Sequence, residues 1–444
     1  MKPRLILVGN GMAGVRTLEE LLKRAPGQYD ITVFGEEPYG NYNRIQLSPV
    51  LAGEKTIAQI ITHAPEWYAA NGIKLLTGDA VVAIDREAKT VTSAKGVTAA
   101  YDVLLLATGS KPFVLPVPGK ELPGVIAFRD IADVDSMLSA SRTYTHAVVI
   151  GGGLLGLEAA NGLVKRGMTV SVVHLSDIIM ERQLDRPAAV LLQRSLESRG
   201  IKFLLKAATA ELLGETRVEA VRFKDGREVP ADLVVMAAGI IPNAALAKAS
   251  GLECERGIVV DDALRSSDPS IYAVGECAQH RKICYGLVAP LWDQAIVCAE
   301  HLAAVSTAAY EGSVVSTKLK VTGIDLFSAG NFQGGEGSEE LVFRDPKRGI
   351  YKKLVVRDGR LDGAVLVGDT RDGGWYYELI QQKAHVGHWR NKLVFGRSFC
   401  EQPLERPGEG PANGGIDGNA NAARRLGSTT IERRNPPAPE AQAA

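Results

Sequence analysis

Two segments of the chain repeat one pattern: a short apolar run, a glycine-rich turn and an amphipathic stretch. They lie at 4–22 and 147–164. Each is followed by a second apolar run, at 30–34 after the first segment and at 169–173 after the second. Apolar runs of this length are typical of buried strands, and strands that alternate with helices predict parallel sheets covered on both faces. The sequence therefore predicts an α/β fold with two similar halves.

The two halves are predicted to be nested. Apolar runs at 103–109 and 233–239 end in small residues and glycine, and each lies downstream of its own glycine turn. A further buried strand is predicted at 271–275, after the second half is complete, and we assign it to the first half. We therefore expect two Rossmann-type domains, with the second inserted in the first. Their expected bounds are 1–115 with 255–312, and 116–254.

The pattern changes in the last third of the chain. Short β-type runs with turns between them replace the alternation of strands and helices, at 318–321, 349–356 and 363–367. The turn at 357–360 has the composition of a hairpin. These features predict a third, α+β domain at 313–400. The stretch at 401–444 is rich in Pro, Gly, Ala and Asn and poor in aromatic residues, which predicts a disordered tail.

Charge and composition exclude several classes of partner and site. The 51 basic and 51 acidic side chains cancel, so charge gives no argument for nucleic acid or an anionic membrane. The apolar run at 5–8 is shorter than the roughly 7–15 residues of a signal-peptide core, and no stretch approaches the roughly 18 apolar residues of a membrane span. None of the five cysteines forms a CxxC pair, which argues against a zinc site and a disulfide framework. We expect a cytoplasmic protein without a metal site.

The first glycine turn fits the pattern GxGxxG, directly after a strand and at the start of a helix. The first glycine allows the tight bend, the second lets a pyrophosphate approach the backbone, and the third lets the helix pack closely on the strand. The helix N-terminus supplies N–H donors, and a carboxylate after the next strand can accept ribose hydroxyls. These features predict a dinucleotide site. The residues assigned to it are Gly9, Gly11, Met12, Ala13, Gly14 and Glu36.

The second glycine turn repeats the pattern and predicts a second dinucleotide site. Two such sites in one chain imply two different dinucleotides, and hydride transfer between a nicotinamide and a flavin is the natural reason to hold both. The residues assigned to the second site are Gly151, Gly153, Leu154, Gly156, His174 and Gly239.

The turn after the strand at 169–173 bears on the choice between NADH and NADPH. No arginine occupies it to accommodate a 2′-phosphate, which favours NADH, with NADPH as the alternative. The usual ribose carboxylate is also missing, and His174 stands in its place. The sequence leaves open whether His174 is a packed surface residue or a contact of the cofactor.

The chain resembles the pyridine nucleotide–disulfide oxidoreductase superfamily of FAD proteins. The resemblance covers roughly 3–310 and rests on five motifs in the same order, among them Ala107-Thr-Gly109, Ala237-Ala-Gly239 and the stretch 239–242. It implies FAD on the first domain and NAD(P)H on the second. By this resemblance Val82, Thr108 and Gly109 belong to the FAD site. Glu276 would bond the ribityl chain of FAD, at a position where the family usually has the shorter Asp.

One branch of this superfamily uses a redox cysteine beside the flavin, and this chain lacks it. The corresponding stretch, 38–48, contains no cysteine. It is instead similar to the YxRxxLS motif of reductases that pass electrons singly to iron–sulfur carriers, which assigns Arg44 and Ser48 to the FAD site. In many of those proteins a lysine follows the serine and pairs with a helix glutamate near the flavin. Here Pro49 follows, with Lys55 as a substitute, and Glu158 is assigned to the surroundings of nicotinamide and flavin.

Further stretches narrow the resemblance. Those at 180–185, 275–281, 285–290 and 318–323 are similar to the flavoprotein half of assimilatory NAD(P)H nitrite reductase large subunits and of nitrate reductase electron-transfer subunits. Those proteins continue into iron–sulfur or sirohaem modules, whereas Cys400, at the end of the third domain, is the only cysteine after 312 here. The resemblance implies that FAD passes electrons from NADH to a partner that carries an iron–sulfur or sirohaem centre, with the third domain and tail as docking surface.

Two other functions fit the same motifs. One is a general NADH-dependent ferredoxin or rubredoxin reductase, and the other is a non-catalytic protein that senses nicotinamide redox state through FAD. The sequence leaves open whether the chain forms a homo-oligomer. His280 follows a strand assigned to the FAD site and is a hypothetical neighbour of the flavin. His385 and His388 have a spacing compatible with one helix face, packed or solvated rather than metal-binding.

Overall fold

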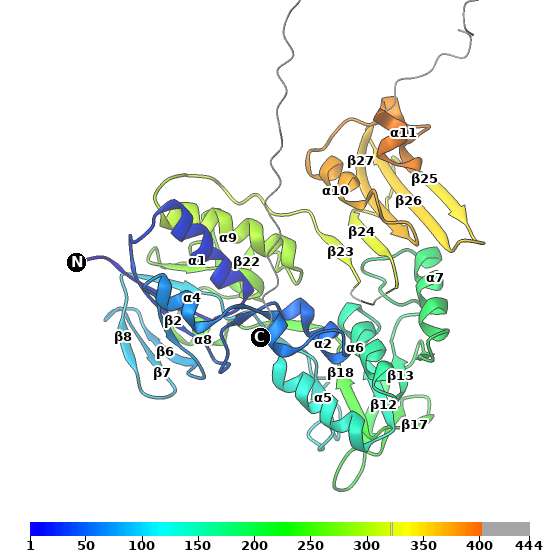
Figure 1. Ribbon diagram of the computed structural model, residues 1–444, viewed down its shortest axis with the longest axis horizontal. Helices are drawn as coiled ribbons and strands as arrows, with labels where there is room; N and C mark the ends of the chain where they lie inside the picture. The colour runs from blue at the N-terminus through cyan, green and yellow to red at the C-terminus, as the bar shows by residue number, and fades with distance from the viewer. Residues whose placement is uncertain (320, 322, 402–444) are drawn as a thin grey trace, which may run out of the picture. The chain divides into compact units, whose positions relative to one another are not determined.

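The computed structural model describes residues 1–319, 321 and 323–401. The predicted disordered tail, apart from Glu401, lies outside the described residues. Within them, the elements form two parallel sheets with their helices and one antiparallel sheet (Figure 1). No described helix combines the length and the apolar character that crossing a bilayer requires.

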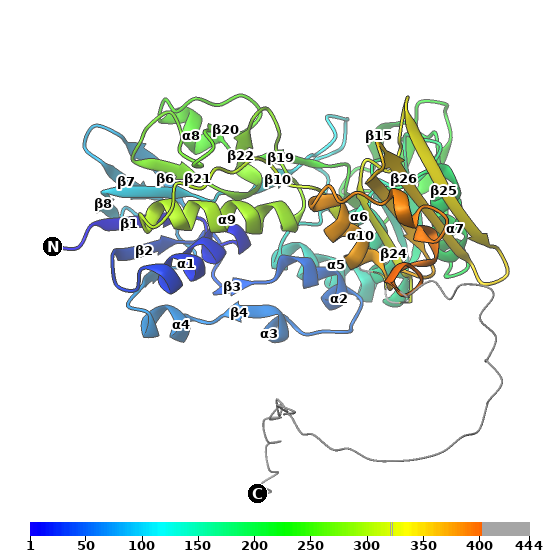
Figure 2. The same cartoon turned by 90° about the horizontal axis from the view of Figure 1, so that it is seen from above.

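The first sheet is parallel and has the strand order β21-β9-β1-β2-β5. Its strands are β1 (Arg4–Val8), β2 (Asp30–Phe34), β5 (Lys74–Leu76), β9 (Val103–Leu106) and β21 (Ile271–Ala273). Helices α1 (Met12–Arg24) and α9 (Val288–Leu302) lie side by side, as Figures 1 and 2 both show. Strand β21 pairs with β9 in the register Ile271↔Leu104. The prediction that the second half is inserted in the first is therefore confirmed.

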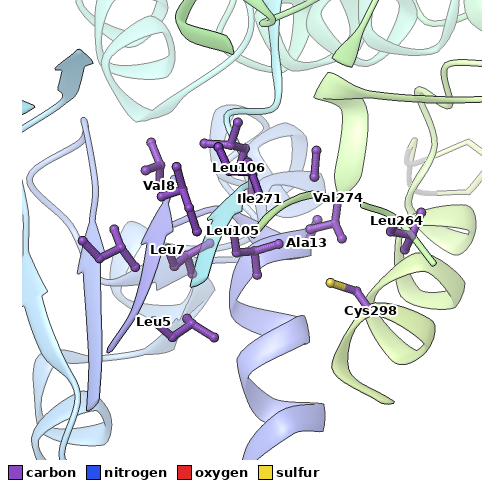
Figure 3. Close-up of a cluster of buried hydrophobic side chains, with 14 of the residues drawn as sticks. Leu5, Leu7, Val8, Ala13, Leu105, Leu106, Leu264, Ile271, Val274 and Cys298 are labelled. Atoms are coloured by element: carbon purple, nitrogen blue, oxygen red, sulfur yellow. The ribbon is translucent and has the colours of Figure 1, made fainter. Parts of the chain in front are cut away.

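Apolar side chains cover this sheet on both faces, as its sequence predicts. Figure 3 shows part of the cluster, which includes strand residues such as Leu5 and Leu105 together with Cys298 of α9. These three side chains are fully buried. Burial on both faces explains why the strands are continuous Val, Ile and Leu runs rather than alternating ones.

The second sheet is also parallel, with the order β11-β18-β12-β13-β14. Its strands are β11 (Val125–Ala127), β12 (His146–Ile150), β13 (Thr169–Val173), β14 (Lys202–Leu204) and β18 (Leu233–Met236). The helices of this region are α5 (Ile131–Thr143), α6 (Leu154–Lys165) and α7 (Arg186–Glu197). The chain enters this half through β10 (Ser110–Pro112) and leaves it through β19 (Ile240–Pro242). These two strands pair with each other in an antiparallel ribbon.

Smaller elements complete the two halves. Two three-stranded antiparallel sheets consist of β6 (Val81–Asp85), β7 (Thr90–Ser93) and β8 (Thr98–Ala100), and of β15 (Thr209–Leu213), β16 (Ala220–Phe223) and β17 (Glu228–Pro230). Two-stranded pairs are formed by β3 (Asn41–Tyr42) with β4 (Ile61–His63) and by β20 (Ile258–Val260) with β22 (Ala278–His280). The short helices here are η1 (Arg44–Gln46), α2 (Leu47–Leu51), α3 (Ile57–Ile60), α4 (Pro65–Ala70), α8 (Ala245–Ala249) and η2 (Gly275–Cys277).

Helix α2 belongs to the first half in sequence but packs on the second half. It lies against α5 and α6 (Figure 1). Leu51 of α2 is fully buried, and a Cβ built on Gly162 of α6 would come within 2.7 Å of its Cγ. The glycine therefore permits this close approach. Because of it, the stretch that ends in α2, which belongs to the first half in sequence, lies beside the helix that the second glycine turn opens.

The third domain is an antiparallel sheet with the order β23-β24-β27-β26-β25, which confirms the predicted α+β class. Its elements are β23 (Ser316–Lys318), β24 (Leu326–Gly330), β25 (Ser338–Asp345), β26 (Ile350–Arg357), β27 (Arg360–Val367), α10 (Gly373–Gln381), η3 (Gly387–Trp389), η4 (Leu393–Phe395) and α11 (Arg397–Glu401). The predicted hairpin is present, because Arg357 pairs with Arg360 across Asp358 and Gly359, both with positive φ. The strand predicted at 318–321 was wrong in its bounds. It ends at Lys318, and Val321 is instead a buried residue of the core beside α7.

Candidate dinucleotide sites

The first glycine turn lies at the carboxyl edge of the first sheet. Gly9 has φ +105°, and a Cβ there would lie 2.2 Å from the carbonyl oxygen of Ala107. The backbone of the turn therefore packs directly against the backbone at the end of the neighbouring strand, β9. Gly14 brings α1 close to the sheet, because a Cβ on it would come within 2.8 Å of Leu7. These are the two contacts for which the turn needs glycine.

Gly11 has a different role in the same turn. It is the N-cap of α1, no side chain caps the helix, and the first turn holds no acidic residue. A Cβ on Gly11 would meet no atom within 4 Å. The first N–H groups of α1, including those of Met12 and Ala13, have no partner within the helix, and the position beside Gly11 is open. Backbone donors at the positive end of a helix dipole fit the pyrophosphate of a dinucleotide.

The side chain of Asn10 holds this turn in place, although no sequence motif marks it. Its amide donates to the carbonyl oxygen of Tyr39 at 3.2 Å and accepts the hydroxyl of Tyr68 at 2.6 Å. The amide of Asn41 donates to the carbonyl oxygen of Asn10 at 2.9 Å. Burial raises the pKa of Tyr68 to about 12, so its hydroxyl stays a donor. The turn is thus fixed from three sides.

Other residues assigned to the first site lie around the same sheet edge. Glu36 is exposed just after β2, the strand beside β1. Gly109 follows β9 with φ +66°, and Thr108 donates to the carbonyl oxygen of Asn243 at 2.6 Å. Val82 stands in β6 and is 57% exposed. The structure thus places the first three next to strands that neighbour the turn, and Val82 on the adjoining small sheet.

Glu276 follows β21 and is held by two side chains. It forms an ion pair with Arg129 and accepts the hydroxyl of Ser110 at 2.9 Å. Arg129 directly precedes the N-cap of α5, so this ion pair joins the first half to the second. No motif marked Arg129, because the pair spans 147 residues of sequence.

Arg44 lies next to Arg129 and is also engaged by protein groups. It donates to the carbonyl oxygen of Arg129 at 2.6 Å and to Glu37 at 2.6 Å. Glu37 accepts the hydroxyl of Tyr42 at 2.7 Å as well. Arg44, Glu37, Arg129 and Glu276 therefore form one charged cluster beside the first turn. Sequence reasoning assigned Arg44 and Glu276 to the site but missed the two partners.

The second glycine turn repeats the geometry of the first. Gly151 has φ +131°, with the carbonyl oxygen of Ala237 2.2 Å from a built Cβ, and Gly156 closely approaches the carbonyl oxygen of Gly151. Gly153 is the N-cap of α6, again without a capping side chain, and a Cβ on it would meet no atom within 4 Å. Leu154 begins the helix, and Gly239 follows the adjacent strand β18. Open N–H donors here also fit a pyrophosphate.

His174 directly follows β13 and closes onto the second turn. The N–H of Gly152 donates to its Nδ1 at 3.1 Å, and its Nε2 lies 2.9 Å from Oε2 of Glu181. The side chain is only 12% exposed. Both ring nitrogens thus have partners within the protein, and the ring is packed against the turn. His174 links the turn to Glu181, a residue that sequence reasoning missed.

The structure also shows the contacts of the three other histidines that the sequence analysis discussed. His280 is buried, and its Nε2 lies 2.8 Å from Asp262. The expectation that His385 and His388 share a helix face was wrong. α10 ends at Gln381, His385 bridges to Arg360, and His388 lies in η3. Among the described residues no group of three or more His, Cys, Asp or Glu is placed to hold a metal.

Ser48 and Glu158 meet where helix α2 packs on helix α6. Both are buried, and the Ser48 hydroxyl donates to Oε2 of Glu158 at 2.5 Å. Ser48 belongs to helix α2 and Glu158 to helix α6, so their hydrogen bond joins the two halves. The suggested substitute Lys55 is exposed and has no ion pair within the described part of the chain.

Comparison with known proteins agrees with this geometry. Residues 3–312 match the family model of pyridine nucleotide-disulphide oxidoreductases, and residues 316–384 match that of the rubredoxin NAD+ reductase C-terminal domain. A nitrite reductase (NAD(P)H) of Bacillus subtilis (strain 168) is 52% identical over 87% of this chain and 48% of its own length. The assimilatory nitrate reductase electron transfer subunit of the same organism is 47% identical over 88% of this chain and 51% of its own length. The chain thus spans about half the length of these relatives.

A solved structure shows the same arrangement of elements. The crystal structure of a covalent putidaredoxin reductase–putidaredoxin complex superposes with a TM-score of 0.78 at 27% identity. The alignment covers 86% of this chain and 94% of the other.

Proposed function

Since the chain belongs to the pyridine nucleotide-disulphide oxidoreductase family, we propose that it is the flavoprotein that takes electrons from NADH for a partner redox protein. FAD and NAD(P)H are its cofactors, and it is an oxidoreductase. The observation that supports the proposal most is the pair of uncapped helix N-termini, at Gly11 and Gly153, each with open space before it. The protein thus offers one pyrophosphate cradle for each of the two dinucleotides.

Bound FAD supplies the ability to accept electrons in a pair and to release them one at a time. The residues of the chain bind and orient the reactants. The N–H groups at Gly11 would hold the FAD pyrophosphate, and those at Gly153 would hold that of the nicotinamide dinucleotide. The buried and hydrogen-bonded side chains of Ser48 and Glu158 would line the site where the flavin and the nicotinamide ring meet. Val82, Arg44, Glu36, Thr108, Gly109 and Glu276 are proposed contacts of FAD.

We place the acceptor in nitrogen assimilation. The two relatives with the highest identities quoted above are named as a nitrite reductase and as an electron transfer subunit of nitrate reductase. An iron–sulfur or sirohaem centre is the proposed acceptor, docking on the third domain at 313–400. We also place the reaction in the cytoplasm, where free thiols such as Cys254, Cys277, Cys284 and Cys298 persist.

A general ferredoxin or rubredoxin reductase is the second candidate function. It is favoured by the match of residues 316–384 to a rubredoxin reductase domain and by the likeness to putidaredoxin reductase. The two candidates share the same flavin chemistry and differ only in the acceptor.

Anaerobic stopped-flow absorbance of the yellow holoprotein tests the proposal. Mixing with NADH is expected to bleach the visible flavin band, and adding a sirohaem nitrite reductase module is expected to restore it. Restoration only by ferredoxin or rubredoxin would favour the second candidate. If FAD is bound but neither NADH nor NADPH bleaches it within minutes, the reductase function is wrong and a redox-sensing role takes its place.

A further inference from the structure

The second dinucleotide turn lacks the residue that normally reads the adenosine ribose. In Rossmann folds an Asp or Glu at the end of the second strand accepts the ribose hydroxyls of NAD, whereas a nearby Arg accommodates the 2′-phosphate of NADP. That strand is β13, and His174 stands at its end. The chain must therefore meet the ribose with other groups.

The contacts of His174 determine which of its nitrogens carries the proton. Its Nδ1 accepts the N–H of Gly152 at 3.1 Å, so Nδ1 is unprotonated. In the neutral ring the proton is then on Nε2, which donates to Oε2 of Glu181 at 2.9 Å. A Cβ on Gly152 would come within 2.8 Å of the His174 ring, so the ring packs directly on the turn. His174 thus links the glycine turn to the Glu181 carboxylate.

A loop closure brings Glu181 to this place. Met180, just before it, has φ +52° and donates its N–H to the carbonyl oxygen of Gly152 at 2.9 Å. Ile179, Met180 and Leu184 are buried and anchor the loop in the core. The carboxylate between these anchors is 40% exposed, which leaves it accessible to a ligand at the turn.

We propose that Glu181, positioned by His174, accepts the ribose hydroxyls of the adenosine half of NADH and repels the 2′-phosphate of NADPH. The inference rests on the proposed function, because it concerns the same nucleotide site. A carboxylate can accept two hydroxyl hydrogens, while its negative charge opposes a dianionic phosphate. The role that a strand-end carboxylate plays in other Rossmann domains is thus taken by a residue seven positions further on.

Basic residues near the loop supply the competing interpretation. Arg186 and Lys206 lie 2.6 and 4.0 Å from the carboxylate of Asp177, three residues beyond His174. Free guanidinium or ammonium groups there would favour a 2′-phosphate. The Arg186 guanidinium, however, already donates to Asp177, so that carboxylate offsets its charge. Arg182, next to Glu181, is exposed and is a further basic group for the competing interpretation. Glu181 differs from all of these groups because it contacts the strand-end residue itself, and this contact favours NADH.

Equilibrium binding to the holoprotein, measured by titration calorimetry, tests the inference without any flavin reaction. The probes are ADP-ribose and its 2′-phosphorylated form. The wild-type protein is expected to bind ADP-ribose at least about tenfold more tightly. Glu181→Gln is expected to weaken ADP-ribose and strengthen the 2′-phosphorylated form, so that most of the discrimination is lost. Glu197→Gln, which removes an exposed carboxylate on α7, is the matched control and is expected to change neither affinity.

His174→Ala tests the positioning role. Removal of the ring frees Glu181, so the variant is expected to lose part of the discrimination while its FAD content and thermal midpoint stay near those of the wild type. Steady-state kinetics should show the change in KM for NADH and not in kcat.

Three results would overturn the inference: wild-type preference for the 2′-phosphorylated probe, equal effects of Glu181→Gln on both probes, or the same loss in the Glu197→Gln control. The proposed function fails separately, if NADH does not reduce the flavin. Selective binding of ADP-ribose without flavin reduction would sustain the inference and refute the function.

Discussion

The hydroxyl of Ser48 donates a hydrogen bond to Glu158 across 110 residues of sequence, and both side chains are buried. A buried carboxylate is costly unless it is hydrogen-bonded. The bond therefore stabilises the charge of Glu158 and joins α2 of the first half to α6 of the second. Helix α6 begins at the second glycine turn, so the bond connects the first half to the helix that is proposed to hold the nicotinamide dinucleotide.

We predict that Ser48→Ala slows flavin reduction by NADH about tenfold, equivalent to about 1.4 kcal/mol of barrier. The variant removes the Ser48 donor from the buried Glu158 carboxylate and so weakens the hydrogen bonding that orients it. Stopped-flow absorbance measures the rate. Ser136→Ala, an exposed serine on α5, is the control and should leave the rate unchanged. An unchanged rate in Ser48→Ala, with FAD still bound, would exclude a role for this hydrogen bond in the reaction.

The capping glycines should separate binding of the two dinucleotides. Gly11 and Gly153 have φ near −85° and open space at the Cβ position, so alanine fits the fold at both. The methyl group would occupy the space that a pyrophosphate needs. Gly11→Ala is expected to yield folded protein without FAD, and Gly153→Ala to yield yellow protein that NADH no longer reduces.

Absorbance spectra and circular dichroism of the purified variants check this pair. Gly374→Ala in α10, where a Cβ also meets nothing within 4 Å, is the control and should change neither cofactor. Gly9→Ala should fail to fold stably, because of its positive φ and the 2.2 Å approach to Ala107. Full FAD content in Gly11→Ala would refute the assignment of the first cradle.

The contact between the third domain and α7 is expected to be stabilising. Tyr351 of β26 is buried and donates its hydroxyl to Asp185, the N-cap of α7, at 2.5 Å. A hydrogen bond to a charged acceptor contributes about 2 kcal/mol. We predict that Tyr351→Phe lowers the free energy of unfolding by about that amount in urea titrations. Tyr144→Phe, at a half-exposed ring, should change it little, and equal losses in both variants would contradict this view of the contact.

Asp369 should make the third domain sensitive to acid. The hydrogen bond from Arg371, with a further one from the buried Lys352, holds the pKa of Asp369 well below its usual value. A carboxylate with a lowered pKa in the fold stabilises it fully above its unfolded pKa of about 4, and this contribution is lost as the pH falls below that value.

Asp369→Asn tests this dependence. At neutral pH it leaves the Lys352 charge buried without its carboxylate, which costs about 3 kcal/mol. The difference in unfolding free energy between wild type and variant is expected to shrink steadily as the pH is lowered from about 5 to about 3. Asp358→Asn, at a turn residue, is the control. If this difference stays constant with pH, folding does not lower the pKa of Asp369.

The elements that depend on neighbouring residues alone were predictable from the amino-acid sequence. The two glycine turns, the apolar strands that precede them and the nested order of the halves were all predictable, because continuous apolar runs and GxGxxG spacing act within a few residues. The hairpin at Asp358 and Gly359 was predictable for the same reason. The bounds of the strand at Ser316–Lys318 were not, since they depend on pairing with β24 and on the core beside α7.

Only the tertiary structure decided which side chains surround the turns. Arg129 reaches Glu276, and Ser48 reaches Glu158, because helices distant in sequence pack together. Glu181 reaches His174 because buried apolar neighbours fold its loop back onto the second turn. A charge in an exposed loop carries no sequence pattern that tells where the loop will close. The sequence therefore located both glycine turns, and packing selected the charged residues beside them.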